Sequence, residues 1–176
     1  MWCFPVATWI TNCLPVSETQ IRIARPDEHS RVLSVYAALG YRRTIDPANI
    51  VWLAERAEET VGIVRVAAEH GTLVLRGMRI IEHARRHRIG TRMLQAIADW
   101  LGDRECYCVP YAHLVGFYGQ IGFTVLDLSA APAFLAERVA DYRRSGQEAI
   151  LMHKPPARLS SGHQPQCSGV REKIER

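Results

Sequence analysis

The sequence lacks three features, each of which would indicate a specialised class of protein. No uninterrupted apolar run approaches the roughly 20 residues that a helix needs to cross a bilayer. No Cys-x-x-Cys pair is present, and the odd number of cysteines, five, matches no disulfide scaffold. Lys and Arg total 22 against 18 Asp and Glu, an excess too small for a dedicated nucleic-acid-binding surface. We therefore expect no metal, membrane or nucleic acid among the partners of this chain.

Two of the cysteines fall in a predicted strand. Cys106 and Cys108 are two residues apart, so their side chains point to the same face of a sheet. We interpret them as small core residues rather than metal ligands. Because free thiols are typical of a reducing compartment, we expect a cytoplasmic protein.

Composition divides the chain into a central region and two ends. Residues 1–19 form an N-terminal arm of unknown role, whose first 15 residues are apolar and uncharged. It lacks the basic start of a signal peptide, and a docked arm, an interface segment and a mis-set start codon are all open alternatives. Residues 155–176 are rich in Pro, Ser, Gly and charge, which is typical of a disordered tail. The region between, 20–154, has the length of one ordinary domain.

The hydrophobic pattern of the central region predicts alternating strands and helices. The expected strands cover 21–24, 50–55, 61–68, 72–80, 105–109, 123–126 and 148–153, and the expected helices cover 27–39, 90–101, 112–121 and 133–144. The strands between 50 and 80 follow one another through short polar turns, which favours antiparallel pairing. This order predicts an α/β (α+β) fold with a mixed sheet and helices on its faces.

A cluster of arginines lies between a predicted strand and a predicted helix. Residues 79–92 hold five arginines and one acid, so this segment accounts for the whole net charge of +4. The N-terminus of a helix offers free N–H groups and a positive dipole end, and nearby arginines add charge-assisted contacts to phosphate. The pattern therefore indicates a site for a diphosphate ligand. A solvated basic turn and a general nucleic-acid patch are the alternatives.

Two motifs of the chain, in this order, resemble the GNAT superfamily of N-acetyltransferases. The Arg-Arg-His-Arg-Ile-Gly segment of residues 85–90 is similar to the acetyl-CoA signature Arg/Gln-x-x-Gly-x-Gly/Ala, except that Arg88 replaces its first glycine. The Phe-Tyr-Gly-Gln-Ile-Gly-Phe segment of residues 117–123 is similar to a second family block, Phe/Leu-Tyr-x-x-x-Gly-Phe. The resemblance covers residues 20–153 and implies a GNAT-like mixed, mostly antiparallel sheet flanked by helices.

The resemblance also implies an acetyl-CoA-dependent N-acetyltransferase in which an amine attacks the thioester directly in a ternary complex. In such an enzyme Tyr118 would be the general acid that protonates the departing thiolate. Glu82 is the expected base, with His83, His113 and Glu69 as alternatives. The implied cofactor-binding residues supply main-chain groups to the pantetheine arm or contacts to the diphosphate: Ile80, Ile81, Arg85, Arg86, His87, Arg88, Ile89, Gly90 and Thr91.

The acceptor is less well defined. The resemblance implies a small-molecule or peptide amine, bound between the segment 41–49 and the predicted helix 133–144, and a homodimer contact through that helix is open. An alternative function is a non-catalytic acyl-CoA-binding or regulatory module on the same fold, motivated by Arg88 and by the lack of an obvious base.

Overall fold

The computed structural model describes residues 18–157, so the predicted arm and tail lie almost entirely outside the described residues. One seven-stranded sheet has the strand order β1-β2-β3-β4-β5-β7-β6. Every neighbouring pair is antiparallel except β4 and β5, which are parallel. The strands are β1 (Gln20–Ile23), β2 (Ile50–Arg56), β3 (Glu59–Glu69), β4 (Thr72–Ile80), β5 (Cys106–Cys108), β6 (Thr124–Val125) and β7 (Met152–Lys154). The predicted mixed, mostly antiparallel fold is confirmed.

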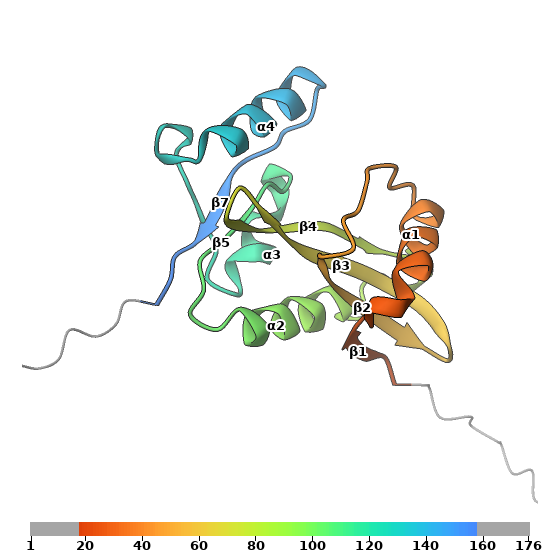
Figure 1. Ribbon diagram of the computed structural model, residues 1–176. Helices are drawn as coiled ribbons and strands as arrows, with labels where there is room; N and C mark the ends of the chain where they lie inside the picture. The colour runs from red at the N-terminus through yellow and green to blue at the C-terminus, as the bar shows by residue number, and fades with distance from the viewer. Residues whose placement is uncertain (1–17, 158–176) are drawn as a thin grey trace, which may run out of the picture.

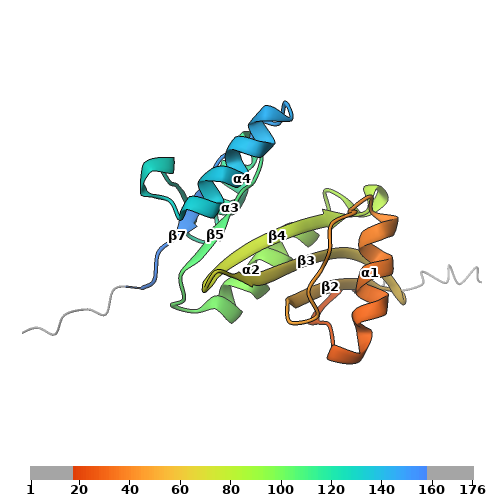
Figure 2. The ribbon, with the colours of Figure 1, turned by 45° about the horizontal axis from the view of Figure 1, so that its top comes forward.

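Helices cover both faces of this sheet, as Figures 1 and 2 show. The helices are α1 (His29–Ala38), α2 (Ile89–Leu101), α3 (Val115–Gly119) and α4 (Ala133–Arg144). Alternate residues of a strand face opposite sides. Leu53 and Ile63 therefore pack under α1, whereas their neighbours Trp52 and Val64 join the larger core that α2 and α3 cover. Val74 packs under α4 in a third cluster.

The sheet opens between β4 and β5. These strands pair only at Val74↔Tyr107 and Leu75↔Cys108, although β4 continues to Ile80. Figure 2 shows the two strands diverging from this junction. Because no described strand covers the far half of β4 on that side, its main-chain groups there are available to a ligand.

A β-bulge interrupts β4 just beyond the junction. Arg76 pairs with Arg65 and Arg79 pairs with Ile63, so Gly77 and the following residue oppose a single residue of β3. Gly77 has φ +63°, a left-handed conformation that favours glycine. The bulge changes the direction in which the following residues of β4 point.

Some predicted boundaries were wrong. The helix expected at 112–121 is a 3-10 turn (Ala112–Leu114) followed by the five residues of α3. Gly116 and Gly119 lower the helix propensity of that segment. The expected strand 105–109 shortens to β5, in which Cys106 and Cys108 are buried as predicted. Within residues 18–157, no helix is both long enough and apolar enough to cross a membrane.

Candidate active site

The predicted diphosphate loop leads directly into α2. Arg88 precedes the helix, and its carbonyl accepts the first helical hydrogen bond from the N–H of Arg92. The N–H groups of Ile89, Gly90 and Thr91 consequently have no acceptor within the helix. Arg88 is the N-cap residue, but its side chain accepts no capping hydrogen bond in the described structure. The side chains of residues 85–88 are exposed around this helix end. This geometry suits an anion.

Arg88 takes the backbone conformation that the missing glycine would take. Its φ is 58° and its ψ is 12°, in the left-handed region, and Arg86 is also left-handed with φ 65°. For a residue with a Cβ this conformation costs about 1 kcal/mol. The arginine therefore keeps the path of the loop unchanged and adds an exposed guanidinium beside the helix end.

The two sequence motifs meet at Gly90. A Cβ built on this residue would lie 3.1 Å from Cζ of Phe117 and 3.2 Å from Cδ1 of Ile80. Any side chain here would push the start of α2 away from β4 and α3. The glycine thus allows three predicted site segments to pack against one another, which the separate motifs did not establish.

The end of β4 directs one pair of main-chain groups toward the opening. The Ile81 N–H donates to the carbonyl of Val61 at 3.0 Å, and the Ile81 carbonyl accepts from Ala84 at 3.1 Å. Since neighbouring residues of a strand point their main-chain groups to opposite sides, those of Ile80 point away from β3, toward the opening. The Ile80 carbonyl also accepts a bond from Nε of Arg85 at 3.3 Å. Ile80 is therefore better placed than Ile81 to bind a pantetheine arm.

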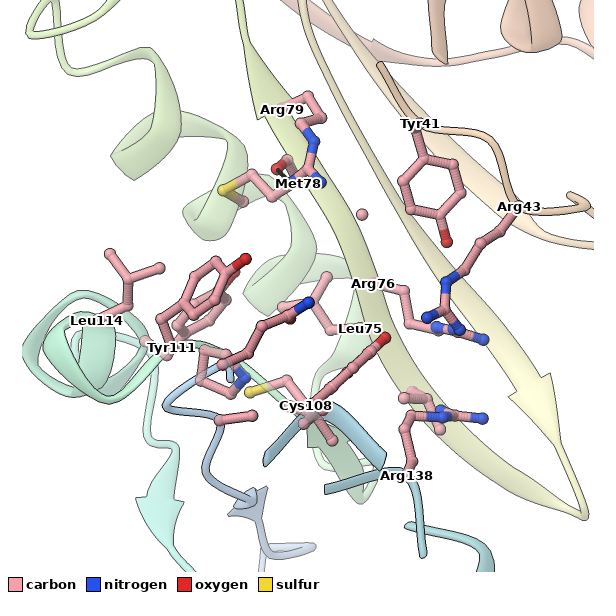
Figure 3. A pocket seen from close by; sticks show the side chains of 18 of the residues that line it. Tyr41, Arg43, Leu75, Arg76, Met78, Arg79, Cys108, Tyr111, Leu114 and Arg138 are labelled. Carbon is pink, nitrogen blue, oxygen red and sulfur yellow. Dashed lines mark hydrogen bonds between the residues drawn. The ribbon is translucent and has the colours of Figure 1, made fainter. Parts of the chain in front are cut away.

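A cavity of about 440 Å³ lies beside the bulge, where β4 and β5 part. Tyr118 lines it together with Met78, Cys108 and Leu114; Figure 3 shows the last three. The ring of Tyr118 lies edge-on to Phe117, with centroids 5.2 Å apart, and this contact restricts its orientation. The phenol is only 8% exposed.

Burial controls the protonation of Tyr118. It raises the pKa of the phenol well above its usual range, and the nearby Cys108 adds to this effect. The positive charge of Arg79 acts in the opposite direction. The hydroxyl is consequently a hydrogen-bond donor at neutral pH, with a cation close enough to stabilise the phenolate.

The other end of the cavity is basic. The lining includes five arginines from three segments: Arg42, Arg43, Arg76, Arg79 and Arg138. Figure 3 shows Arg43, Arg76 and Arg138 gathered on one side of β4. No Asp or Glu is among the described residues that line this cavity. The segment after α1 and the helix α4, both expected to shape an acceptor site, therefore lie at one cavity.

The predicted bases lie elsewhere. Glu82 is exposed on a short 3-10 turn and does not line the cavity. His83 lies 3.5 Å from Glu59, and His113 stacks on Tyr111. Glu69 sits behind the cavity, bound to two arginines. In the described part of the chain, none of the four predicted bases is brought to Tyr118.

Sequence reasoning missed a buried arginine under the bulge. Arg65 of β3 is 2% exposed, and its Nη2 donates to the hydroxyl of Tyr41 at 2.5 Å. Its guanidinium lies over the rings of Tyr41 and Tyr36, at 4.8 and 5.3 Å from their centroids. The only signal in the sequence is one charged residue between the two glutamates that end the otherwise apolar strand Glu59–Glu69.

Residues 18–157 contain no group of three or more His, Cys, Asp or Glu side chains that could hold a metal ion. Burial raises the pKa of the Cys106 thiol to about 12 and that of Cys108 well above its usual range. Both thiols are therefore neutral at physiological pH and poor metal ligands or nucleophiles.

Solved structures with the same fold include three acetyl- or acyltransferases. N-acetylglutamate synthase from Neisseria gonorrhoeae, complexed with coenzyme A and N-acetyl-glutamate, has a TM-score of 0.59 and 15% identity. The match covers 81% of this chain and 36% of the synthase, so this chain spans about a third of that protein. Naa50 from Arabidopsis thaliana, bound to the bisubstrate analogue CoA-Ac-MVNAL, has a TM-score of 0.56 and 15% identity, covering 77% and 97% of the two chains.

An acyl-CoA N-acyltransferase from Pseudomonas aeruginosa is similar to the same degree. Its TM-score is 0.54 and its identity 16%, and the match covers 78% of this chain and 99% of that one. At these identities the likeness shows the fold alone. No curated protein matches the sequence. Residues 11–123, well over half of the chain, match the family described as "Acetyltransferase (GNAT) family". With both motifs and the opened sheet in place, the chain belongs to the acetyltransferase (GNAT) family.

Proposed function

We propose that this protein is an N-acetyltransferase that uses acetyl-CoA to acetylate an amine. The observation that carries this proposal is the position of Tyr118. This buried residue lines a cavity that begins where β4 and β5 part. A proton donor is needed at that place if a thioester lies along the free edge of β4.

The residues present fit the cosubstrate. The free N–H groups at the start of α2, with Arg85 and Arg86 beside them, would hold the diphosphate. The outward main-chain groups of Ile80 would bind the pantetheine arm. When bound, acetyl-CoA supplies an activated acetyl group as a thioester. The CoA complexes among the similar structures support this assignment.

Direct attack in a ternary complex assigns two tasks to the chain. A carbon–nitrogen bond forms between the amine and the acetyl carbon, and the carbon–sulfur bond breaks. Tyr118 gives its proton to the departing sulfur, and the proton that the attacking nitrogen loses restores the phenol. N–H groups of β4 near the bulge stabilise the negative carbonyl oxygen. Arg79 stabilises the phenolate that Tyr118 leaves behind, because its charge opposes the effect of burial on the phenol.

The amine must be neutral before it can attack, since an alkylammonium has a pKa of about 10. The lining of the cavity holds five arginines and no described carboxylate. Positive surroundings disfavour an ammonium and lower the pKa of a bound amine. The proton can then pass to solvent without a carboxylate base. The role of Glu82 as a base stays a prediction. Its position outside the cavity lining supports that role less well than the position of Tyr118 supports a role as general acid.

The absence of a carboxylate among the described lining residues also favours a second candidate, a non-catalytic acyl-CoA-binding module. That candidate predicts tight CoA binding with no release of thiol in the presence of any amine. The replacement of the motif glycine by Arg88 is the other argument for this candidate. The left-handed conformation of Arg88 weakens that argument, because the loop keeps the conformation that glycine would give it.

Replacing Tyr118 by Phe tests the mechanism. We expect Tyr118→Phe to lower kcat by about 100-fold and to change CoA affinity by less than about twofold, because only the transferable proton is lost. Thiol release and calorimetric titration measure the two quantities. Tyr107→Phe is the matched control, since Tyr107 is similarly buried but outside the cavity lining. Unchanged turnover in Tyr118→Phe would remove this residue from the mechanism.

A further inference from the structure

The charge of the cavity is one-sided. Its five arginines come from the loop after α1, from β4 and from α4, and no described acid among the lining residues faces them. Segments that lie about 100 residues apart in sequence, Arg42–Arg43 and Arg138, thus bring cations to one small volume. Such a concentration of like charge attracts an anion.

Two of the arginines are already paired. Glu69 binds Nη1 of Arg76 and Nη2 of Arg138, each at 2.5 Å. Burial opposes ionisation of Glu69, but the hydrogen bonds from both arginines outweigh it and hold the pKa of the carboxyl below its usual range. One carboxylate thus holds two guanidinium groups at the cavity edge. Nη1 of Arg138 is still buried without a hydrogen-bond partner among the described residues.

The other three arginines have no carboxylate within ion-pair distance in residues 18–157. Instead, aromatic rings orient two of them. The guanidinium carbon of Arg43 lies 5.2 Å from the ring centre of Tyr142, and that of Arg79 lies 5.8 Å from the ring centre of Tyr41. Such contacts hold a cation in place without cancelling its charge. The cavity therefore presents oriented, uncompensated positive charge.

We infer that the acceptor is a small amine that carries an anionic group, a carboxylate or a phosphate, as in an amino acid. This inference rests on the proposed acetyl transfer. Guanidinium groups bind such anions through paired hydrogen bonds, whereas they repel a purely cationic amine. A volume of about 440 Å³ accommodates a molecule of this size beside the thioester end of the cosubstrate.

The anionic group and the amine have separate places in this cavity. The anion meets Arg43, which lies near Arg76 and Arg138 at the basic end (Figure 3). The amine then extends toward Met78 and Tyr118, where the thioester is expected. The same arginines favour the neutral form of the amine, so one set of side chains both selects the acceptor and activates it.

An acceptor series tests the inference by thiol release from acetyl-CoA at fixed pH and low salt. The series compares L-glutamate with glutamate dimethyl ester, which lacks both carboxylates, and O-phosphoethanolamine with ethanolamine, and it adds spermidine as a cationic amine. We expect kcat/KM of each anionic amine to exceed that of its neutral counterpart by about 10- to 100-fold. The glutamate and phosphoethanolamine arms distinguish carboxylate from phosphate.

Variants identify the residues. Arg43→Gln should raise KM for the preferred anionic amine by about 10-fold and leave CoA affinity within about twofold. Arg43→Glu should abolish the preference for L-glutamate over glutamate dimethyl ester. Arg144→Gln is the control, because Arg144 is exposed on α4 and does not line the cavity. The discrimination should also shrink as salt is raised.

Two outcomes separate this inference from the proposed function. Efficient acetylation of spermidine or ethanolamine above the anionic amines would overturn the inference and leave acetyl transfer intact. No thiol release with any amine would overturn the proposed function. In that case equilibrium binding of labelled L-glutamate against glutamate dimethyl ester decides the inference, and equal affinities for wild-type protein would overturn it.

Discussion

Placing a methyl group on Gly77 would test how the bulge of β4 is packed. A Cβ at this position would lie 2.6 Å from Nη1 of Arg65 and 3.2 Å from the hydroxyl oxygen of Tyr36. Arg65 cannot move aside, because it is buried between Tyr36 and Tyr41. Gly77 also has φ +63°, so alanine would be strained even without the overlap.

The expected cost follows from these two effects. The left-handed conformation costs an alanine about 1 kcal/mol. Forcing a methyl group into a packed interior costs about 1–3 kcal/mol. The lower entropy of alanine in the unfolded chain returns about 0.5–1 kcal/mol. We therefore expect Gly77→Ala to lower the free energy of unfolding by about 1–3.5 kcal/mol.

Urea denaturation followed by circular dichroism measures this loss, provided that the slope m is unchanged. Gly71→Ala is the matched control, since Gly71 has φ +75° and no described atom lies within 4 Å of the place that its methyl group would take. That variant should lose less than about 1 kcal/mol, because only the backbone strain applies. If the two variants are equally stable, the contact between the bulge and Arg65 does not exist as described.

Three further outcomes are expected. Arg86→Glu should weaken CoA binding by about 10-fold in calorimetry at low salt and by less at high salt, where exposed charges are screened; equal losses at both would contradict a phosphate contact. The pKa of Glu28 is held well below its usual range by bonds from Arg22 and the Arg25 N–H, so its contribution is complete above about pH 4.3, the usual value, and is lost as the pH falls further. The free energy of unfolding, measured by urea denaturation at a series of acid pH values, should fall over this range, and Glu28→Gln should make it less dependent on pH. Cys106 and Cys108 should resist alkylation, mapped by mass spectrometry, until urea unfolds the chain, because burial raises both pKa values.

The periodicity of apolar residues correctly predicted those strands and helices whose limits depend mainly on their own sequence. The alternation of apolar residues in β2 and β3 and the apolar stripe of α2 determined their type and approximate bounds. The short β5 and the divided segment at 112–119 were not predicted, because pairing partners and tertiary contacts set their limits.

The candidate site shows the same division. The diphosphate loop and Tyr118 were found through the two motifs, which are continuous in sequence. The bulge at Gly77 depends on the register between two strands, and the burial of Arg65 depends on rings from α1 and the loop after it. The one-sided charge of the cavity arises only when segments distant in sequence meet. Such features follow from packing rather than from any single stretch of residues.

At the proposed site, the short junction between β4 and β5 would give the cosubstrate a structural role as well as a chemical one. Two residue pairs are a weak connection between the halves of a sheet, although the core beneath α2 continues across it through Cys106 and Met152. A molecule seated in the opening would tie both halves together along their length. Its binding energy would then add directly to resistance against unfolding, by about 2.7 kcal/mol at a concentration 100 times Kd. The cellular supply of CoA would in this way set how long the folded enzyme persists.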